Sequence, residues 1–336
     1  MITGELIIMT EKKRILSGMR PTGPLHLGNL HGALQNWIEL QEKYECFFFI
    51  ADWHALTSDY ENTALISNNV KNMMIDWLSA GLSYEKSTLF IQSHVKEHAE
   101  LFLILSMITP VPWLERNPTY KEQIIQLNNK DLSTFGFLGY PVLQAADIII
   151  YKAYGVPVGI DQVPHVEITR EIARRFNHLY KDVFPEPKAI LTDTPKILGS
   201  DRRKMSKSYN NAIYLSDTPD EISSKVASMI TDPQRAKKSD PGNPDICNVF
   251  EFHKLYSDKD IVNTIKDDCI QAKIGCVGCK KIIAKNLADA LKPIREKRQF
   301  YEERTSLIED IIVDGTRKAK KIACDTMKEV KSAMNI

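Results

Sequence analysis

The sequence lacks any apolar run of the roughly 18–20 residues that a membrane-spanning helix requires. It also lacks an excess of one charge, because 44 lysines and arginines face 43 acidic residues and leave a net charge of +1. We therefore expect no membrane partner, and a uniformly basic nucleic-acid binder is excluded. The first ten residues show no long apolar stretch with a small-residue cleavage site, so we expect no secretory signal and a cytoplasmic location.

The composition is that of a globular protein, with 43% hydrophobic and 26% charged residues in a chain of 336. Short apolar runs alternate with amphipathic stretches over the first two thirds of the chain. The predicted strands are Arg14–Ser17, Cys46–Ala51, Thr88–Ile91 and Val156–Val158. Helical spacing predicts helices from Leu27 to Leu40 and from Ala64 to Leu82. This alternation predicts an α/β domain over residues 12–215, with a Rossmann-like parallel sheet.

A second, helical domain is predicted over residues 216–336. Strand-like runs disappear there, and residues 280–334 have helical spacing, apart from a break that we expect near Gly315. From residue 273 onward the chain has 15 basic and 9 acidic residues. This excess would suit contacts with phosphates, although charge alone favours a solvated helical surface.

The common nucleotide-binding signatures, G-x-G-x-x-G and G-x-x-x-x-G-K-[ST], are missing. A different loop follows the first predicted strand, with the sequence SGMRPTGPLHLGN over residues 17–29. Its glycines and prolines predict a shaped loop, and His26 and Asn29 bring hydrogen-bonding groups to the start of the next helix. Gly28 has no side chain, so an adenine or ribose could approach the backbone. This loop alone leaves open an ordinary connection between strand and helix.

A lysine-containing loop resolves that question. Lys204 and Lys207 belong to the sequence KMSKS, which follows HLGN by about 175 residues. Two lysines separated by small and flexible residues can close over a polyphosphate. Together, HLGN and KMSKS closely resemble the two signatures of class I aminoacyl-tRNA synthetases. Asn29 departs from the usual final histidine of the first signature, a substitution familiar in the tryptophanyl branch.

The resemblance implies a set of ATP-binding residues. His26 and Asn29 would contact the phosphates, while Lys204 and Lys207 would stabilise the pyrophosphate as it leaves. ATP would enter with Mg²⁺. The full set implied for ATP is Arg20, Pro21, Thr22, Gly28, Asn29, Gly159, Ile160, Asp161, Ile197, Lys204, Met205, Ser206, Lys207 and Ser208.

Residues 140–177 carry the densest resemblance, and it is to the tryptophanyl enzymes. Asp147 would accept the hydrogen bond of an indole N–H, and Tyr140 and Gln162 would hold the substrate ammonium. Tyrosyl relatives place a tyrosine on the first strand, where this chain has Leu16. For His54, a place in the core is an equal alternative to a place near the substrate. The set implied for tryptophan is Leu16, His54, Tyr140, Gln144, Asp147, Val156, Val158 and Gln162.

Four of the six cysteines form a ladder with the spacing C-x21-C-x6-C-x2-C. They are Cys247, Cys269, Cys276 and Cys279. In a chain expected to be cytosolic, such a ladder indicates metal binding before disulfides. It resembles a cysteine set in a subset of bacterial tryptophanyl enzymes that carry a [4Fe–4S] cluster. We rank that cluster ahead of zinc, and zinc ahead of free thiols.

The resemblance implies a homodimeric enzyme with ATP, L-tryptophan and tRNA(Trp) as partners. Its α-helical C-terminal domain would bind the anticodon. A tyrosyl-tRNA synthetase is the closest rival, and pyrophosphate exchange with each amino acid separates the two. A catalytically silent RNA-binding paralogue is the rival from another class, and the intact lysines of KMSKS argue against it.

Overall fold

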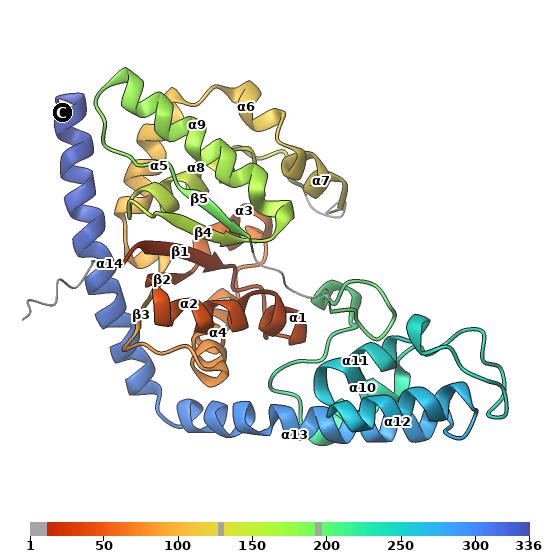
Figure 1. Ribbon diagram of the computed structural model, residues 1–336. Helices are drawn as coiled ribbons and strands as arrows, with labels where there is room; N and C mark the ends of the chain where they lie inside the picture. The colour runs from red at the N-terminus through yellow and green to blue at the C-terminus, as the bar shows by residue number, and fades with distance from the viewer. Residues whose placement is uncertain (1–11, 127–130, 192–196) are drawn as a thin grey trace, which may run out of the picture.

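A five-stranded parallel sheet lies at the centre of the larger part of the protein (Figure 1). The computed structural model describes residues 12–126, 131–191 and 197–336. The strands are β1 (Arg14–Met19), β2 (Glu45–Ile50), β3 (Ser87–Ile91), β4 (Gly155–Val158) and β5 (Lys188–Leu191). Their order is β3-β2-β1-β4-β5, so the strand order reverses between β1 and β4. Such a boundary leaves a crevice at the carboxyl ends of the strands, where α/β proteins bind ligands.

Helices follow the strands and cover both faces of the sheet. They are α1 (Leu27–Asn29), α2 (Gln35–Lys43), α3 (Asp52–Asp59), α4 (Ile66–Ala80), α5 (Glu97–Ile108), α6 (Val111–Glu115), α7 (Pro118–Gln126), α8 (Phe135–Ile149) and α9 (Val163–Leu179). In Figure 1, α1, α2 and α4 lie below the sheet, and α5, α8 and α9 lie above it.

Burial on both faces explains the unbroken apolar run of β2. The ring of Phe48 stacks on Trp37 of α2, with 4.6 Å between ring centroids. Phe47 and Phe49 point to the opposite core, which α5 and α8 share. A strand covered on both sides needs apolar residues at successive positions, not at alternate ones.

The predicted α/β class and Rossmann-like parallel sheet are confirmed, and each of the four predicted strands is present. The predicted helix over 64–82 is α4, and Gly81 caps its end with φ at +120°. β5 was not predicted, because its four residues form a short run at the sheet edge with no buried position.

The predicted helix from Leu27 to Leu40 is interrupted by a π-helical segment, Leu30–Leu34 (η1), between α1 and α2. π-turns are rare and occur mostly at functional sites. The wider turn was not foreseen, because apolar spacing does not distinguish it from an α-helix. Gly32 and Ala33 in this segment line the cavity described below.

The chain after residue 217 forms helices and loops without strands. Its helices are α10 (Pro219–Ser228), α11 (Asn248–Tyr256), α12 (Lys259–Ile270), α13 (Cys276–Glu302) and α14 (Thr305–Met334). α13 runs along the foot of the molecule in Figure 1, and α14 turns back beside β3. A separate domain over 216–336 stays a prediction. The part of the chain that the structure describes contains no candidate for a membrane-spanning helix.

The break predicted near Gly315 is wrong. The helices change at Glu303 and Arg304, and Gly315 lies inside α14. A Cβ atom at this position would collide with the backbone carbonyl of Leu89 in β3. The glycine therefore allows close packing of α14 on the sheet edge and does not end the helix.

Candidate active site

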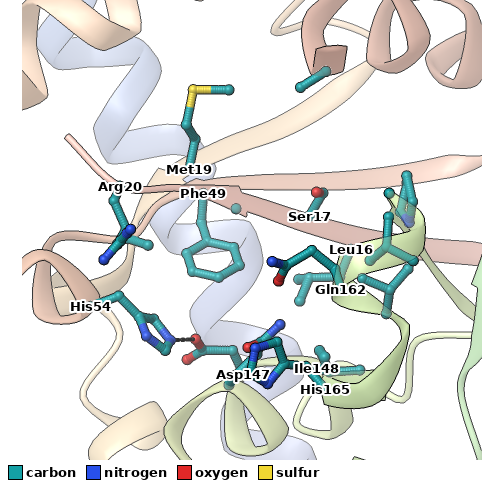
Figure 2. A pocket seen from close by; sticks show the side chains of 18 of the residues that line it. Leu16, Ser17, Met19, Arg20, Phe49, His54, Asp147, Ile148, Gln162 and His165 are labelled. Atoms are coloured by element: carbon teal, nitrogen blue, oxygen red, sulfur yellow. Dashed lines mark hydrogen bonds and ion pairs between the residues drawn. The ribbon is translucent and has the colours of Figure 1, made fainter. Parts of the chain in front are cut away.

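A cavity of about 370 Å³ opens at the carboxyl ends of β1 and β4, where the strand order reverses (Figure 2). Doubly wound sheets bind ligands at this position. The structure brings together around this one cavity all eight residues predicted to bind tryptophan. They are Leu16, His54, Tyr140, Gln144, Asp147, Val156, Val158 and Gln162.

Asp147 of α8 is the charged group at the inner end of the cavity, with only 1% of its surface exposed. Its Oδ2 lies 2.8 Å from Nε2 of His54, and its Oδ1 lies 2.6 Å from Nδ1 of His98. Gln92 donates to both oxygens at 2.9 Å. Burial acts most strongly on the pKa of Asp147 and would raise it, but the hydrogen bonds from His54 and His98 bring it below the usual value. Asp147 is therefore a fixed, ionised acceptor; Figure 2 shows its contact with His54.

Apolar side chains of β1, β2 and β4 line part of the cavity, and polar side chains line the rest. In Figure 2 the ring of Phe49 lies between β1 and Asp147. Gly18 has to lack a side chain here, because a Cβ atom would lie 2.5 Å from Cζ of that ring. Leu16 and Val156 are buried along the two strands. The apolar part of the cavity thus suits an aromatic ring, and Asp147 suits a hydrogen-bond donor at the edge of that ring.

The HLGN loop is tied to a segment almost 190 residues later in the chain. Leu27 N–H donates to the carbonyl of Ile213 at 3.0 Å, and Leu215 N–H donates to the carbonyl of Leu25 at 2.9 Å. His26 N–H donates to Oδ1 of Asn29 at 3.1 Å, so Asn29 closes the first turn of the helix. These bonds place the loop directly beside the exit of the KMSKS segment.

His26 and the two lysines of KMSKS form a site suited to anions. Burial first, and then the charges of Lys207 and Lys204, lower the pKa of His26 to about 4, so its ring is neutral at pH 7. Its Nδ1 is buried and has no hydrogen-bond partner among the described residues. Nζ of Lys207 donates to the carbonyl of Gly23 at 2.7 Å, and burial lowers the pKa of Lys207 to about 8. With its proton on Nδ1, the neutral ring of His26 can donate to a phosphate oxygen beside the two ammonium groups.

The other residues predicted for ATP lie around this site at different depths. Arg20 and Gly159 line the cavity. Ile197 and Met205 are buried and shape the lysine loop, in which Met205 N–H donates to the carbonyl of Ile197 at 3.1 Å. Ile160 instead exposes 81% of its surface and does not line the cavity.

The remaining six predicted ATP residues lie in these loops or near them. Oγ1 of Thr22 lies 3.4 Å from Nζ of Lys207, and Pro21 beside it is buried. Gly28 faces the ring of His26, and Asp161 is exposed. Ser206 N–H donates to Oδ1 of Asn211 at 2.8 Å. The side chain of Ser208 lies outside the described residues.

The polar residues that were not predicted include three that contact Asp147 or Tyr140. Gln92 and His98 are fully buried against Asp147, and Nε2 of His165 lies 3.3 Å from the hydroxyl of Tyr140. Gln92 directly follows the third predicted strand, and a polar residue at that end was a usable signal. The sequence around His98 gave no such signal, because His98 contacts Asp147 only after the fold brings α5 next to α8. His165 stood in the densest stretch of resemblance without an assigned role.

The four cysteines of the ladder meet at the ends of three helices. Cys247 precedes α11, Cys269 is near the end of α12, and Cys276 and Cys279 begin α13. Burial, followed by the charges of the other three cysteines, raises the pKa of Cys279 to about 12. All four are free thiols. Among the described residues, however, no three histidine, cysteine, aspartate or glutamate side chains are arranged to hold a metal ion.

The protein has a doubly wound sheet with a ligand cavity at the carboxyl end of β1. The histidine loop follows that strand, and the lysine loop lies beside the histidine. These features define an enzyme of the class I aminoacyl-tRNA synthetase type. Residues 9–292 match the family described as tRNA synthetases class I (W and Y). The chain belongs to this family, as the resemblance of HLGN and KMSKS predicted.

Relatives named tryptophan–tRNA ligase are similar in sequence to this protein over nearly its whole length. The tryptophan–tRNA ligase of Thermotoga maritima is 53% identical, over 96% of this chain and 99% of that protein. The tryptophan–tRNA ligase of Aquifex aeolicus is 49% identical, over 96% of this chain and 100% of that protein. The crystal structure of tryptophanyl-tRNA synthetase from Campylobacter jejuni, complexed with ADP and tryptophan, has a TM-score of 0.89 at 33% identity. The structural match covers 96% of this chain and 100% of the Campylobacter jejuni chain.

Proposed function

We infer that this protein is a tryptophan–tRNA ligase, which activates L-tryptophan with ATP and transfers it to tRNA(Trp). The observation that carries the inference is the position of Asp147, a buried ionised carboxylate in a cavity that is partly lined by apolar side chains of β1 and β4. An indole N–H donates and cannot accept, so a carboxylate is its matched partner. The relatives of 49% and 53% identity support the same amino acid.

ATP enters as its magnesium complex and provides the reacting phosphorus. A carboxylate oxygen of tryptophan attacks the α-phosphorus, the bond to the bridging oxygen breaks, and pyrophosphate leaves. Negative charge grows on the leaving group, and the ammonium groups of Lys204 and Lys207 stabilise it. His26, whose neutral ring has no partner at Nδ1, donates a hydrogen bond from Nδ1–H to a phosphate oxygen. The terminal ribose hydroxyl of the tRNA then attacks the carbonyl carbon of the adenylate, and AMP leaves.

The other proposed roles are those that the family resemblance implies. Tyr140 and Gln162 bind the substrate ammonium, and Gly159 and Asp161 contact the ribose of ATP. His54 acts by fixing Asp147, to which it is bonded at 2.8 Å. This role accounts for its burial beside the substrate pocket.

Pyrophosphate exchange tests the amino acid directly. We expect the protein to exchange pyrophosphate into ATP in the presence of tryptophan and not of tyrosine. The physical reason is Leu16, which is 1% exposed and offers no hydrogen bond to a phenol hydroxyl. Asp147 could accept from the hydroxyl, but the phenol oxygen would find no donor at Leu16 and would be only partly paired. Each of the twenty amino acids would be assayed, and comparable exchange with tyrosine would refute the pocket assignment.

We further propose a cytoplasmic homodimer whose helical part, residues 216–336, binds the tRNA anticodon. The charge pattern supports contact with RNA, since residues 273–336 hold 15 basic and 9 acidic residues. Exposed apolar side chains support a second copy as partner, because large unpaired apolar groups mark interaction surfaces. Examples on α5, α7 and α8 are Met107, Ile125 and Phe135.

The four-cysteine region is proposed to hold a [4Fe–4S] cluster, with zinc as the second candidate. Four free thiols converge there from three helix ends, and thiolates are the ligands of both groups. Binding would require the thiols to rotate toward one another, because no ligand shell is closed among the described residues. The cluster would be structural, since these cysteines do not line the cavity.

Anaerobic purification checks this assignment. We expect brown protein with about four irons per chain, because four thiolates complete a cubane cluster. Cys276→Ser should bleach the protein while exchange with tryptophan largely survives. Cys324→Ser, at a cysteine outside the ladder, should keep both colour and iron. Colourless protein with one zinc per chain would contradict the iron assignment and favour zinc. Free alkylation of all four thiols in the native protein would contradict a metal site of either kind.

A further inference from the structure

Asp76 is a buried acid without a role in the reaction described above. It lies in the middle of α4 with 2% of its surface exposed. Its Oδ2 accepts the backbone N–H of Leu25 at 3.2 Å, and Leu25 directly precedes His26. Burial raises the pKa of Asp76 to about 6, although Arg298 and the Leu25 N–H oppose the shift. A buried carboxylate is stable only when hydrogen bonds and an opposite charge offset the free energy of its desolvation.

The partner is Arg298, which comes from α13 in the helical part of the chain. Its Nη1 pairs with Oδ1 of Asp76, and its Nη2 donates to Oδ1 of Asn72 at 3.0 Å. Its Nε pairs with Glu302 at 3.0 Å. The side chain of Arg298 is only 13% exposed. The guanidinium thus uses its fork geometry to join α13 to α4.

α13 connects two distant regions through this pair. The helix begins at Cys276, and the 22 residues from there to Arg298 span roughly 33 Å at 1.5 Å per residue. In Figure 1 α13 runs from the region of α10, α11 and α12 to a position beneath α4. One end of the helix therefore lies at the cysteines and the other at the acid that holds the HLGN loop.

The loop that Asp76 holds is fixed on its other side by the exit of the KMSKS segment. Leu25 gives its N–H to Asp76, and its carbonyl accepts from Leu215 at 2.9 Å. Asp76 also acts on the lysine loop, because its charge opposes the lowering of the Lys207 pKa by burial. Asp76 thus interacts with Arg298 of α13, with the backbone of the HLGN loop and, through its charge, with Lys207.

We propose that Asp76 and Arg298 are positioning residues for adenylate formation, through which α13 fixes the backbone before His26. The proposal rests on the proposed function and adds two residues that do not touch the substrates. A misplacement of about 1 Å at a reacting group can cost up to roughly 100-fold in rate, even when its cause is remote. The pair should therefore affect turnover much more than binding of tryptophan, whose pocket lies around Asp147.

The test compares four variants in tryptophan-dependent pyrophosphate exchange, with active sites titrated and assays run well below each melting temperature. Asp76→Ala should lower kcat roughly 10- to 100-fold and leave the tryptophan KM within about 2-fold. Arg298→Met should act similarly, because it leaves Asp76 buried and unpaired. Adding Asp76→Asn to Arg298→Met should restore part of kcat, since the pair is then removed as a unit. Arg298→Lys is the milder variant, with an intermediate loss.

The matched control is Arg14→Met, which breaks the partly buried pair of Arg14 and Glu45 at the start of β1. It should lower the melting temperature and leave kcat unchanged. If Asp76→Ala and Arg298→Met behave like this control, the pair is only structural and the proposal is overturned. A rise in tryptophan KM as large as the fall in kcat would overturn it equally.

A second measurement tests the role of Asp76 independently of the proposed specificity for tryptophan. Binding of MgATP alone, followed by calorimetry, should weaken several-fold in Asp76→Ala and stay unchanged in Arg14→Met. If the unaltered protein lacked exchange with tryptophan but showed this pattern, the proposed function would fail while Asp76 kept its role at the ATP loop. Unchanged MgATP affinity together with unchanged kcat would refute the role of Asp76 itself.

Discussion

Replacing Lys207 with alanine is expected to lower kcat for tryptophanyl-adenylate formation by roughly 100-fold or more, with little change in the tryptophan KM. In the structure, Nζ of Lys207 rests on the carbonyl of Gly23 at 2.7 Å, at the edge of the phosphate site. The ammonium group is partly desolvated there, since burial lowers its pKa to about 8. Charge on departing pyrophosphate would draw it inward. An interaction made mainly in the transition state appears in kcat and not in substrate binding.

Pre-steady-state formation of the adenylate would measure the effect without the later transfer to tRNA. Lys254→Ala is a matched control, because this lysine lies on α11 and pairs with Glu251 at 2.6 Å, away from the cavity. It should leave the rate unchanged. A Lys207→Ala variant with a raised tryptophan KM and normal kcat would contradict the assignment of Lys207 to the leaving group.

Much of this site could be predicted because short segments of the sequence resemble family signatures. The resemblance of HLGN and KMSKS implies a phosphate-binding loop and two lysines that stabilise the leaving group. The pocket residues of β1 and β4 likewise came from the resemblance to the tryptophanyl enzymes. Leu16 and Val158 lie more than 140 positions apart, and both line the cavity.

What escaped prediction depends on contacts between distant elements. His98 reaches Asp147 only because α5 crosses α8, and no feature within the helix marks its role. Gly315 was interpreted as a helix break, yet its cause lies in β3, where the Leu89 carbonyl leaves no room for a side chain. Asp76 and Arg298 look like ordinary helical charges until the fold pairs them. Single-sequence patterns carry no information on such pairings.

Asp147→Asn provides the second large expected effect, a rise in the tryptophan KM of roughly 10- to 100-fold. A hydrogen bond to a charged acceptor contributes about 1.5–3 kcal/mol, and the amide oxygen is a weaker, neutral acceptor. The asparagine keeps the shape of the native side chain, although its NH2 group replaces one of the two oxygens that are bonded to His54, His98 and Gln92. Asp147→Ala should act more strongly, because it also leaves these three buried donors without their acceptor.

A substrate analogue distinguishes loss of the indole bond from general damage to the pocket. Benzothienylalanine has sulfur in place of the indole N–H and therefore cannot donate to Asp147. With the unaltered protein it should bind more weakly than tryptophan by about the factor that Asp147→Asn costs. With Asp147→Asn the two ligands should bind almost equally, because the interaction has already been removed from the protein side. If the variant still preferred tryptophan by the full factor, the indole N–H would have another acceptor and Asp147 would serve only to order the histidines around it.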